Sequence, residues 1–465
     1  MTPVSENPSP ITDAEIAEFF TPLAAWPGVM LAVSGGPDSL ALLHLYARWR
    51  TLGGKRDQTV LVATVDHGLR AQSRAEAEFV AGAAHTLGFD HKTLIWEGPK
   101  PATGRQDAAR NARYRLMAAR LERMPASPRA LVTAHTLDDQ AETVLMRLAR
   151  GSGLDGLAAM APNRPVHTAT GVTLVRPLLG VPGARLRATL AAMGQAWIED
   201  PANRDPANER VRVRQLSAAA AAVGLTNEAL SLTAIRLRRA HDALEAATTA
   251  LEQKATVIRW GLSTTIQRAL FEAAPLELRL RLLGRALTRH GGSHPKPRLV
   301  ELERLVEPLE SPAGARTLGG CLIVPRVDDI IIVRELGRDG LGEITLAPGE
   351  RTIWDDRFEI ALAATAPMPI MIRAMPIEAW NTLKTHLPSA VELDASAAVT
   401  LPSVWHGKTL IGVPRLAALT GPPGIRHIAC ISPDERTADP DLAAHCTLLP
   451  LTSGQLARRK FGEKA

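Results

Sequence analysis

Cysteine is scarce in this 465-residue sequence, which contains only Cys321, Cys430 and Cys446. The three are far apart and odd in number, and they form neither a CxxC pair nor a spacing suited to zinc. A disulfide framework is therefore disfavoured, and the expected environment is a reducing compartment. We expect all three to be small buried side chains.

Long apolar runs are missing too. Because no stretch of about 18 uninterrupted apolar residues occurs, the sequence predicts no membrane span. The first twenty residues are polar and acidic, and they lack the apolar segment of a secretory signal. Internal repeats and low-complexity segments are also absent. The expected location is the cytoplasm, with no membrane partner.

The remaining composition is that of a basic globular protein. Apolar residues make up 46% of the chain, enough for a core, and the length suggests two or three domains. A net charge of +6 mildly favours a polyanionic partner. Arginine greatly outnumbers lysine, and its planar guanidinium donates to phosphate in pairs. Biased codon usage would explain the same excess, so composition leaves both interpretations open.

Strand-length apolar runs alternate with helical patterns in the first third of the chain. The runs are VMLAV (29–33), VLVATV (60–65), KTLIW (92–96) and ALVTA (130–134). Helical spacing is found after Asp38 and over 14–26, 74–87 and 105–124. Buried parallel strands covered by helices on both faces give this pattern, so we predict a doubly wound α/β domain.

The rest of the chain has a different sequence pattern. Residues 160–215 are typical of a loop-rich extension punctuated by proline and glycine, and residues 216–290 of alanine-rich helix. From about residue 317, the short apolar runs CLIVPRV, DIIIVREL, GEITLAP and RFEIALA are separated by Gly, Pro and Asp, which is typical of strands. We therefore predict a helical domain followed by a small β-containing C-terminal domain.

The segment SGGPDS follows the first predicted strand directly and opens a helix. Gly35 and Gly36 allow the backbone conformations and the close approach that a phosphate cradle requires. Pro37 suits a first helical turn, whose N–H groups face an anion. Asp38 suits a magnesium ligand or a carboxylate that orients loop and nucleotide. No Lys follows the second glycine, so this is not a Walker A loop. The predicted nucleotide-binding residues are Ser34, Gly35, Gly36, Pro37, Asp38 and Ser39.

Two further polar clusters lie at predicted strand ends. VDHGLR (65–70) places Asp66 and His67 just past the second strand, and TAHTLDDQAET (133–143) starts a helix after the fourth. Ligands of open α/β sheets bind outside the carboxyl ends of the strands. The three clusters therefore predict one site, with Asp66 and His67 among its nucleotide-binding residues. An ordinary structural role is the alternative for the histidines.

The cluster after the fourth strand contains the acidic pair Asp138 and Asp139 in the first turn of a helix. Acids there complement the helix dipole by about 0.3–1 kcal/mol, but two adjacent acids followed by Glu142 exceed what capping requires. We predict catalytic roles for Asp38, Asp138, Asp139 and His135, with Asp38 and Asp139 also binding a metal. Four residues behind the acids have the spacing of a core stripe: Ala141, Val144, Leu145 and Leu148.

Arginines cluster in two places. GRQDAARNARYR contains Arg105, Arg110, Arg113 and Arg115, and DPANRDPANERVRVR contains Arg204, Arg210, Arg212 and Arg214. A solvated helix face is one interpretation. If the second run is extended, its alternating arginines lie on one side, which suits a phosphate backbone.

Six segments resemble the tRNA(Ile)-lysidine synthase family in order and spacing. They are SGGPDS, VDHGLR, AHTLDDQAET, AARNARY, RPLL (176–179) and WIEDPANRD (197–205), and WDDRF (354–358) resembles a C-terminal motif of the same enzymes. SGGPDS itself resembles the PP-loop of the ATP-pyrophosphatase superfamily, which cleaves between the α- and β-phosphates of ATP through an adenylated intermediate. The resemblance is strong from about residue 28 to 215 and weaker beyond.

The resemblance implies an ATP- and Mg²⁺-dependent ligase that joins L-lysine to C2 of the wobble cytidine in the CAU anticodon of isoleucine tRNA, releasing pyrophosphate and AMP. It implies an N-terminal helix at 1–27, a PP-loop catalytic domain at 28–215, a tRNA-contacting helical domain at 216–316 and a domain at 317–465 that binds the tRNA body. A homodimer is compatible with the sequence. The expected substrate or tRNA contacts are Arg110, Arg113, Glu142, Arg204, Arg210, Arg212 and Arg214.

The match has departures. The family usually has His where this chain has Thr64 and often where it has Thr136, and it has Asn where this chain has Val211. Histidine-specific roles at 64 and 136 are therefore in doubt.

Three other classes are weighed. PP-loop tRNA thiolases need cysteines, and none precedes Cys321. Glutamine-dependent synthetases need an N-terminal cysteine nucleophile, where this chain has Thr2. A non-catalytic adenine-nucleotide-binding protein would keep the phosphate loop without the acids and arginines.

Overall fold

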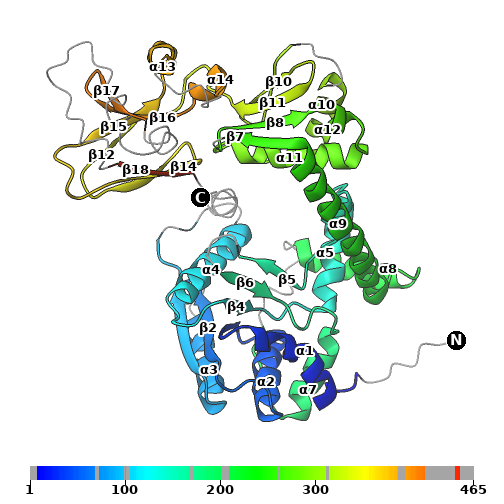
Figure 1. Ribbon diagram of the computed structural model, residues 1–465. Helices are drawn as coiled ribbons and strands as arrows, with labels where there is room; N and C mark the ends of the chain where they lie inside the picture. The colour runs from blue at the N-terminus through cyan, green and yellow to red at the C-terminus, as the bar shows by residue number, and fades with distance from the viewer. Residues whose placement is uncertain are drawn as a thin grey trace. The chain divides into compact units, whose positions relative to one another are not determined.

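The computed structural model describes residues 8–68, 73–98, 100, 105–166, 171–199, 209–259, 261–309, 314–385, 393–413 and 446–450 (Figure 1). These residues fall into two compact units, divided between Ala243 and Leu244. Within the described ranges, none of the helices has the length and apolarity needed to cross a membrane.

The first unit is built on a six-stranded sheet in the order β3-β2-β1-β4-β6-β5. All neighbours pair in parallel except β5, which is an antiparallel edge strand. The four predicted strand runs correspond to the first four strands, so the doubly wound α/β prediction is confirmed. The strands are β1 (Gly28–Ala32), β2 (Thr59–Asp66), β3 (Asp90–Ile95), β4 (Arg129–Val132), β5 (Asn163–Pro165) and β6 (Val172–Val175).

Helices cover both faces of this sheet because successive side chains of each strand point to opposite faces. Val29 and Leu31 of β1 lie in one core, whereas Met30 between them lies in the other. The first face is covered by α1 (Asp13–Phe20), α2 (Pro37–Thr51), α3 (Ser73–Thr86) and α7 (Gly183–Ala192), and the second by α4 (Arg105–Glu122). A 3-10 turn, Thr21–Ala25, extends α1.

Helix α5 (Leu137–Ala149) buries its apolar side against α9 (Asn227–Ala255) and the segment after α6 (Leu154–Leu157). Ala141 and Val144 pack there as predicted, with Leu145 partly buried. The prediction for Leu148 was wrong, because that side chain is 57% exposed. It lies in the last turn of α5, where the helical spacing continues but the buried contacts end.

The second unit begins with a five-stranded antiparallel sheet in the order β7-β8-β11-β10-β9, packed with helices. Its first two strands lie in the stretch that was predicted to be entirely helical. Their sequences, TVIR and STTIQ, are rich in β-branched residues, which favour a pleated surface. The elements are β7 (Thr256–Arg259), β8 (Ser263–Gln267), α10 (Arg268–Glu272), α11 (Leu276–His290), α12 (Leu299–Leu309), β9 (Arg316–Leu318), β10 (Cys321–Pro325) and β11 (Asp329–Arg334).

Two smaller antiparallel sheets complete the second unit, as the strand pattern after residue 317 predicts. Their core contains Trp354, Phe358, Ile372 and Val404. The elements are β12 (Ile344–Leu346), β13 (Arg351–Trp354), β14 (Phe358–Leu362), β15 (Ile370–Ala374), α13 (Ile377–Lys384), α14 (Ala395–Ala398), β16 (Pro402–His406), β17 (Thr409–Gly412) and β18 (Cys446–Pro450). Cys321 is fully buried as expected, and Cys430 lies outside the described residues.

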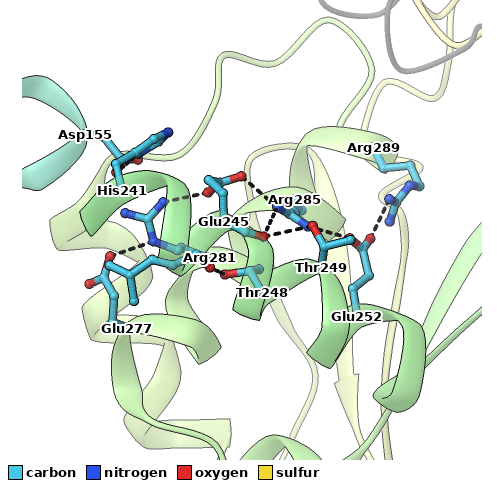
Figure 2. Close-up of polar contacts among 11 residues, drawn as sticks. Asp155, His241, Glu245, Thr248, Thr249, Glu252, Glu277, Arg281, Arg285 and Arg289 are labelled. Carbon is cyan, nitrogen blue, oxygen red and sulfur yellow. Dashed lines mark hydrogen bonds and ion pairs between the residues drawn. The ribbon is translucent and has the colours of Figure 1, made fainter. Parts of the chain in front are cut away.

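An ion-pair ladder joins α9 to α11 in the second unit (Figure 2). Glu245 accepts hydrogen bonds from Arg281 at 2.6 Å and from Arg285 at 2.7 Å. Glu252 accepts from Arg285 at 2.9 Å and from Arg289 at 2.7 Å. Because Arg285 bonds both glutamates, the ladder is continuous along the two helices.

Candidate active site

The SGGPDS loop connects β1 to α2 and is closed by its own serines. The Ser39 hydroxyl donates to the Gly36 carbonyl at 3.0 Å and accepts from the Ser34 N–H at 3.1 Å. Gly35 has φ +89°, and a Cβ there would lie 2.8 Å from Ile198 Cδ1, so only glycine fits. No side chain caps α2, and Pro37 occupies its first turn. The N–H groups of that turn are therefore placed to bind an anion.

Asp38 is the second residue of α2 and lies in an unfavourable environment for a carboxylate. Burial raises its pKa to about 6, with further contributions from the negative charges of Asp139 and Asp138, against the opposing charge of Arg187. Its buried Oδ1 has no hydrogen-bond partner among the residues that the structure describes. A buried oxygen left in this state is typical of a position that a cation or ligand completes.

The two carboxylate oxygens of Asp139 have different surroundings: one is hydrogen-bonded at the start of α5, and the other lies near an arginine. It forms a capping box with Thr136, accepting from the Thr136 N–H at 2.9 Å while the Thr136 hydroxyl accepts from the Asp139 N–H at 3.4 Å. Its other oxygen, Oδ1, lies 3.6 Å from Nη1 of Arg210. One oxygen thus fixes the start of α5 while the second faces the site.

Asp138 is more fully engaged than its neighbour. Its Oδ2 accepts from the N–H of Gly183, the first residue of α7, at 2.9 Å. Its Oδ1 accepts from Nδ2 of Asn227, the first residue of α9, at 2.8 Å. The sequence did not identify Gly183 or Asn227, because both lie far along the chain from Asp138, the residue that they bond.

The run of alternating arginines is helical, so the condition under which its arginines would lie on one side, an extended run, is not met. It forms α8 (Glu209–Ala221), in which residues four apart share a face and residues two apart do not. Arg210 and Arg214 accordingly face Asp139 and Glu142 of α5, whereas Arg212 is exposed elsewhere on the helix.

Arg214 and Glu142 form a close ion pair in which Glu142 is buried and Arg214 is half exposed. Arg214 Nε bonds Glu142 Oε1, and the Glu142 side chain is only 5% exposed. Burial raises the pKa of Glu142, while Arg214 opposes that rise. Arg204, also predicted to contact tRNA, lies outside the described residues.

His135 is held as a neutral donor. Its Nδ1 accepts from Nε of Arg176 at 3.3 Å and lies 2.8 Å from the Thr133 hydroxyl. Burial, followed by the positive charge of Arg176, lowers the pKa of His135 well below its usual value. Because Nδ1 accepts from a guanidinium, the ring proton resides on Nε2. Arg176 was quoted in the RPLL motif but not predicted as a site residue.

The end of β2 contributes a second group of polar side chains. Asp66 Oδ1 accepts from the Gly68 N–H at 2.8 Å, which turns the chain. His67 Nε2 lies 3.3 Å from Nη2 of Arg113 on α4, and its ring lies edge-on to Trp96 with the centroids 6.0 Å apart. On the same helix, the Arg110 guanidinium lies 5.3 Å from the Tyr114 ring centroid.

These groups belong to one edge of the sheet. The charges of Arg110, Arg113 and Arg210 all act on His135 and help to lower its pKa. The positions at which β1, β2 and β4 end are therefore brought together with α4, α5 and α8. An edge lined by anion-binding amides, carboxylates and arginines suits a nucleotide and a metal ion.

Comparison with known proteins agrees with this geometry. A family model described as a PP-loop domain matches residues 8–219. The chain is 47% identical over 326 residues to a tRNA(Ile)-lysidine synthase of a Bradyrhizobium species, covering 68% of this chain and 88% of that protein. The chain belongs to the tRNA(Ile)-lysidine synthase family. Lysidine synthases of Rhodopseudomonas palustris and Ruegeria pomeroyi are 45% and 38% identical, covering 71% and 84% of this chain and 97% and 89% of theirs.

Two of the three departures from the lysidine synthase pattern, Thr136 and Thr64, have local structural roles. Thr136 caps α5, a role that suits a hydroxyl. The Thr64 hydroxyl donates to the Val33 carbonyl at 2.8 Å and lies 2.9 Å from Nε2 of His91 on β3. The Thr136 hydroxyl therefore stabilises the start of α5, and the Thr64 hydroxyl links the end of β2 to the residue after β1 and to β3.

Proposed function

We propose that this protein ligates L-lysine to C2 of the wobble cytidine in the CAU anticodon of isoleucine tRNA. Cytosine O2 attacks the α-phosphate of ATP and pyrophosphate leaves, giving an adenylated tRNA. The lysine amine then attacks C2 and AMP leaves. The observation that carries this proposal is the PP-loop beside a cluster of carboxylates, in a chain of the lysidine synthase family.

The PP-loop holds the phosphates through the N–H groups at the start of α2. Asp38 and Asp139 would hold Mg²⁺, which neutralises charge on the departing pyrophosphate. The orphaned Oδ1 of Asp38 fits this role, and so does its burial beside the carboxylates of Asp139 and Asp138, which raises its pKa. Within the described ranges, no three His, Cys, Asp or Glu side chains are grouped to hold a metal. Nucleotide oxygens would therefore supply the remaining ligands.

The lysine amine must lose its proton before it attacks. Its pKa of about 10.4 means that holding it neutral at pH 7 costs about 4.6 kcal/mol. Asp139 is the candidate acceptor, because its Oδ1 faces the site. His135 donates through Nε2–H instead and is placed to bond a substrate oxygen. Buried Glu142 lies beside them as a candidate contact for the lysine ammonium.

The tRNA is proposed to contact arginines of the first unit and the β-containing region that follows. Arg110, Arg113 and Arg212 project from α4 and α8, and Arg204 lies in the segment before α8. Guanidinium groups suit phosphate, and a single-stranded anticodon loop allows a base to be splayed into a pocket. Residues 216–316 are proposed to contact the tRNA, and residues 317–465 to bind its body.

The decisive experiment combines the purified protein with Mg-ATP, labelled lysine and an isoleucine tRNA transcript with a CAU anticodon. We expect base-linked label together with AMP and pyrophosphate. A methionine tRNA transcript with the same anticodon is the matched control and should stay unlabelled. If ATP yields pyrophosphate but no label enters the isoleucine transcript, PP-loop chemistry stands and the lysidine proposal fails.

A further inference from the structure

Asp138 accepts a hydrogen bond from a protein group on each of its two oxygens. The Gly183 N–H bonds Oδ2 at 2.9 Å and the Asn227 amide bonds Oδ1 at 2.8 Å. By contrast, Asp38 has a buried oxygen with no partner among the described residues. A carboxylate held by a protein donor on each oxygen has a fixed orientation, which suits a positioning role.

The two donors come from the first residues of different helices. Gly183 begins α7 and Asn227 begins α9, while Asp138 itself lies in the first turn of α5. One carboxylate therefore ties three helix starts together. Each start carries partial positive charge, which favours an anion at this point.

Gly183 also lies next to both Asp138 and Asp38. A Cβ on Gly183 would lie 2.9 Å from Asp138 Oδ2 and 3.4 Å from Asp38 Oδ1. Gly183 is thus packed against both acids. A rotation of the Asp138 carboxylate would therefore also shift Gly183 relative to Asp38.

A neutral donor at position 227 is chemically informative. Asp139 and Glu142 face arginines, which offset their charge, whereas Asp138 faces an amide. An amide orients a carboxylate without neutralising it, so the charge of Asp138 remains available to the three helix starts that meet there.

We propose that Asn227 is a positioning residue that, with the Gly183 amide, clips Asp138 in place. Asp138 then sets the spacing between α5, α7 and α9 around Asp38 and takes no part in proton transfer or metal binding. This inference rests on the proposed function, because it assigns a role within the adenylation site. It replaces the catalytic role first predicted for Asp138.

The activity test compares pyrophosphate release by Asn227→Ala, the exposed neighbour control Glu228→Gln, and the swapped pair Asp138→Asn with Asn227→Asp. Asn227→Ala should lower kcat about 10- to 100-fold with KM for ATP changed less than about threefold, because geometry and not ground-state binding is lost. Glu228→Gln should behave as the parent. The swapped pair keeps one amide and one carboxylate in contact and should recover most of the lost kcat.

Two results would overturn the proposed positioning role of Asn227. The first is a kcat of Asn227→Ala equal to that of the parent protein. The second is a swapped pair that folds normally but stays as slow as Asn227→Ala, because the charge at position 138 would then act directly. A double-mutant cycle of Asp138→Ala and Asn227→Ala on the denaturant midpoint needs no tRNA activity. Additive effects there would also remove the clip, even if lysidine formation itself were disproved.

Discussion

Asp38 combines a proposed metal-binding position with an unfavourable environment for its charge. Its pKa is raised to about 6, first by burial and then by Asp139 and Asp138. The ionised form at pH 7 therefore weakens the ligand-free protein by about 1–3 kcal/mol. Conflicts of this kind are found at binding sites, where the ligand relieves them.

The change Asp38→Asn should remove this conflict and the function together. We expect a higher denaturant midpoint for the ligand-free protein at pH 7–8 and no detectable tRNA adenylation. The stability gain should shrink as pH falls from about 6 to about 4, because the folded protein already protonates Asp38 in that range. Chemical denaturation and pyrophosphate release measure the two effects.

The exposed acid Asp57 provides the control for that change. Asp57→Asn should alter stability by less than about 0.5 kcal/mol and leave adenylation intact. A lower midpoint for Asp38→Asn would contradict the electrostatic explanation, and normal turnover would remove Asp38 from the site.

At the scale of elements, the arginines of α8 lie in two different environments. Arg210 and Arg214 face the acids of α5, while Arg212 is exposed. Arg212→Ala should weaken tRNA binding and reduce the slope of log affinity against log salt by about 1. Filter binding over a salt series measures both quantities.

Arg214→Ala is the contrasting variant on the same helix. It leaves buried Glu142 without the guanidinium that it bonds, so it should lower stability and lysine incorporation more than the salt slope. If Arg212→Ala leaves tRNA affinity unchanged, that side chain has only a structural role.

The α9–α11 ladder gives a second prediction at this scale (Figure 2). Arg285→Met keeps the aliphatic length but removes the bonds to Glu245 and Glu252. We expect a loss of about 1 kcal/mol in the free energy of unfolding of the second unit, smaller at high salt. Arg298→Met is the control, because its ion pair lies on a side chain that is 79% exposed. Equal effects of the two changes would argue against the ladder.

At the scale of the whole molecule, buried histidines make stability depend on pH. Burial lowers the pKa of His44, His91, His135 and His290, that of His290 to about 3. Their unfolded pKa is about 6.5, so below that pH the unfolded chain binds more protons than the folded one. The free energy of unfolding should therefore fall as pH drops from about 6.5, with Asp38 opposing part of the loss.

His290→Gln isolates one of these contributions. The His290 Nε2 lies 2.8 Å from the Thr264 hydroxyl, and a glutamine amide can replace that bond. The wild-type slope should exceed the variant slope by up to about 1.4 kcal/mol per pH unit between pH 6 and pH 4. Urea unfolding of both proteins over this range tests it, and identical slopes would rule out His290 as a titrating group.

Part of this architecture could be predicted because its signals are local. Strand runs of five or six apolar residues and the glycines of SGGPDS act over one turn or one strand, so the parallel sheet and the loop were predicted correctly. The family resemblance is likewise confirmed by relatives that match over most of the chain. Predictions failed where spacing was extrapolated past a local context, as for Leu148 and the strands β7 and β8, and the spacing of the arginines left open whether their run was helical or extended.

The sequence by itself determined the glycine-rich strand-to-helix loop of a PP-loop domain and predicted which acids and arginines lie near it. Only the tertiary structure decided which groups those acids contact. Asp138 meets Gly183 and Asn227 across 45 and 89 residues, and Glu142 meets Arg214 across 72. Such pairings depend on how helices pack, and periodicity along the chain carries no information about which distant residue faces a given carboxylate.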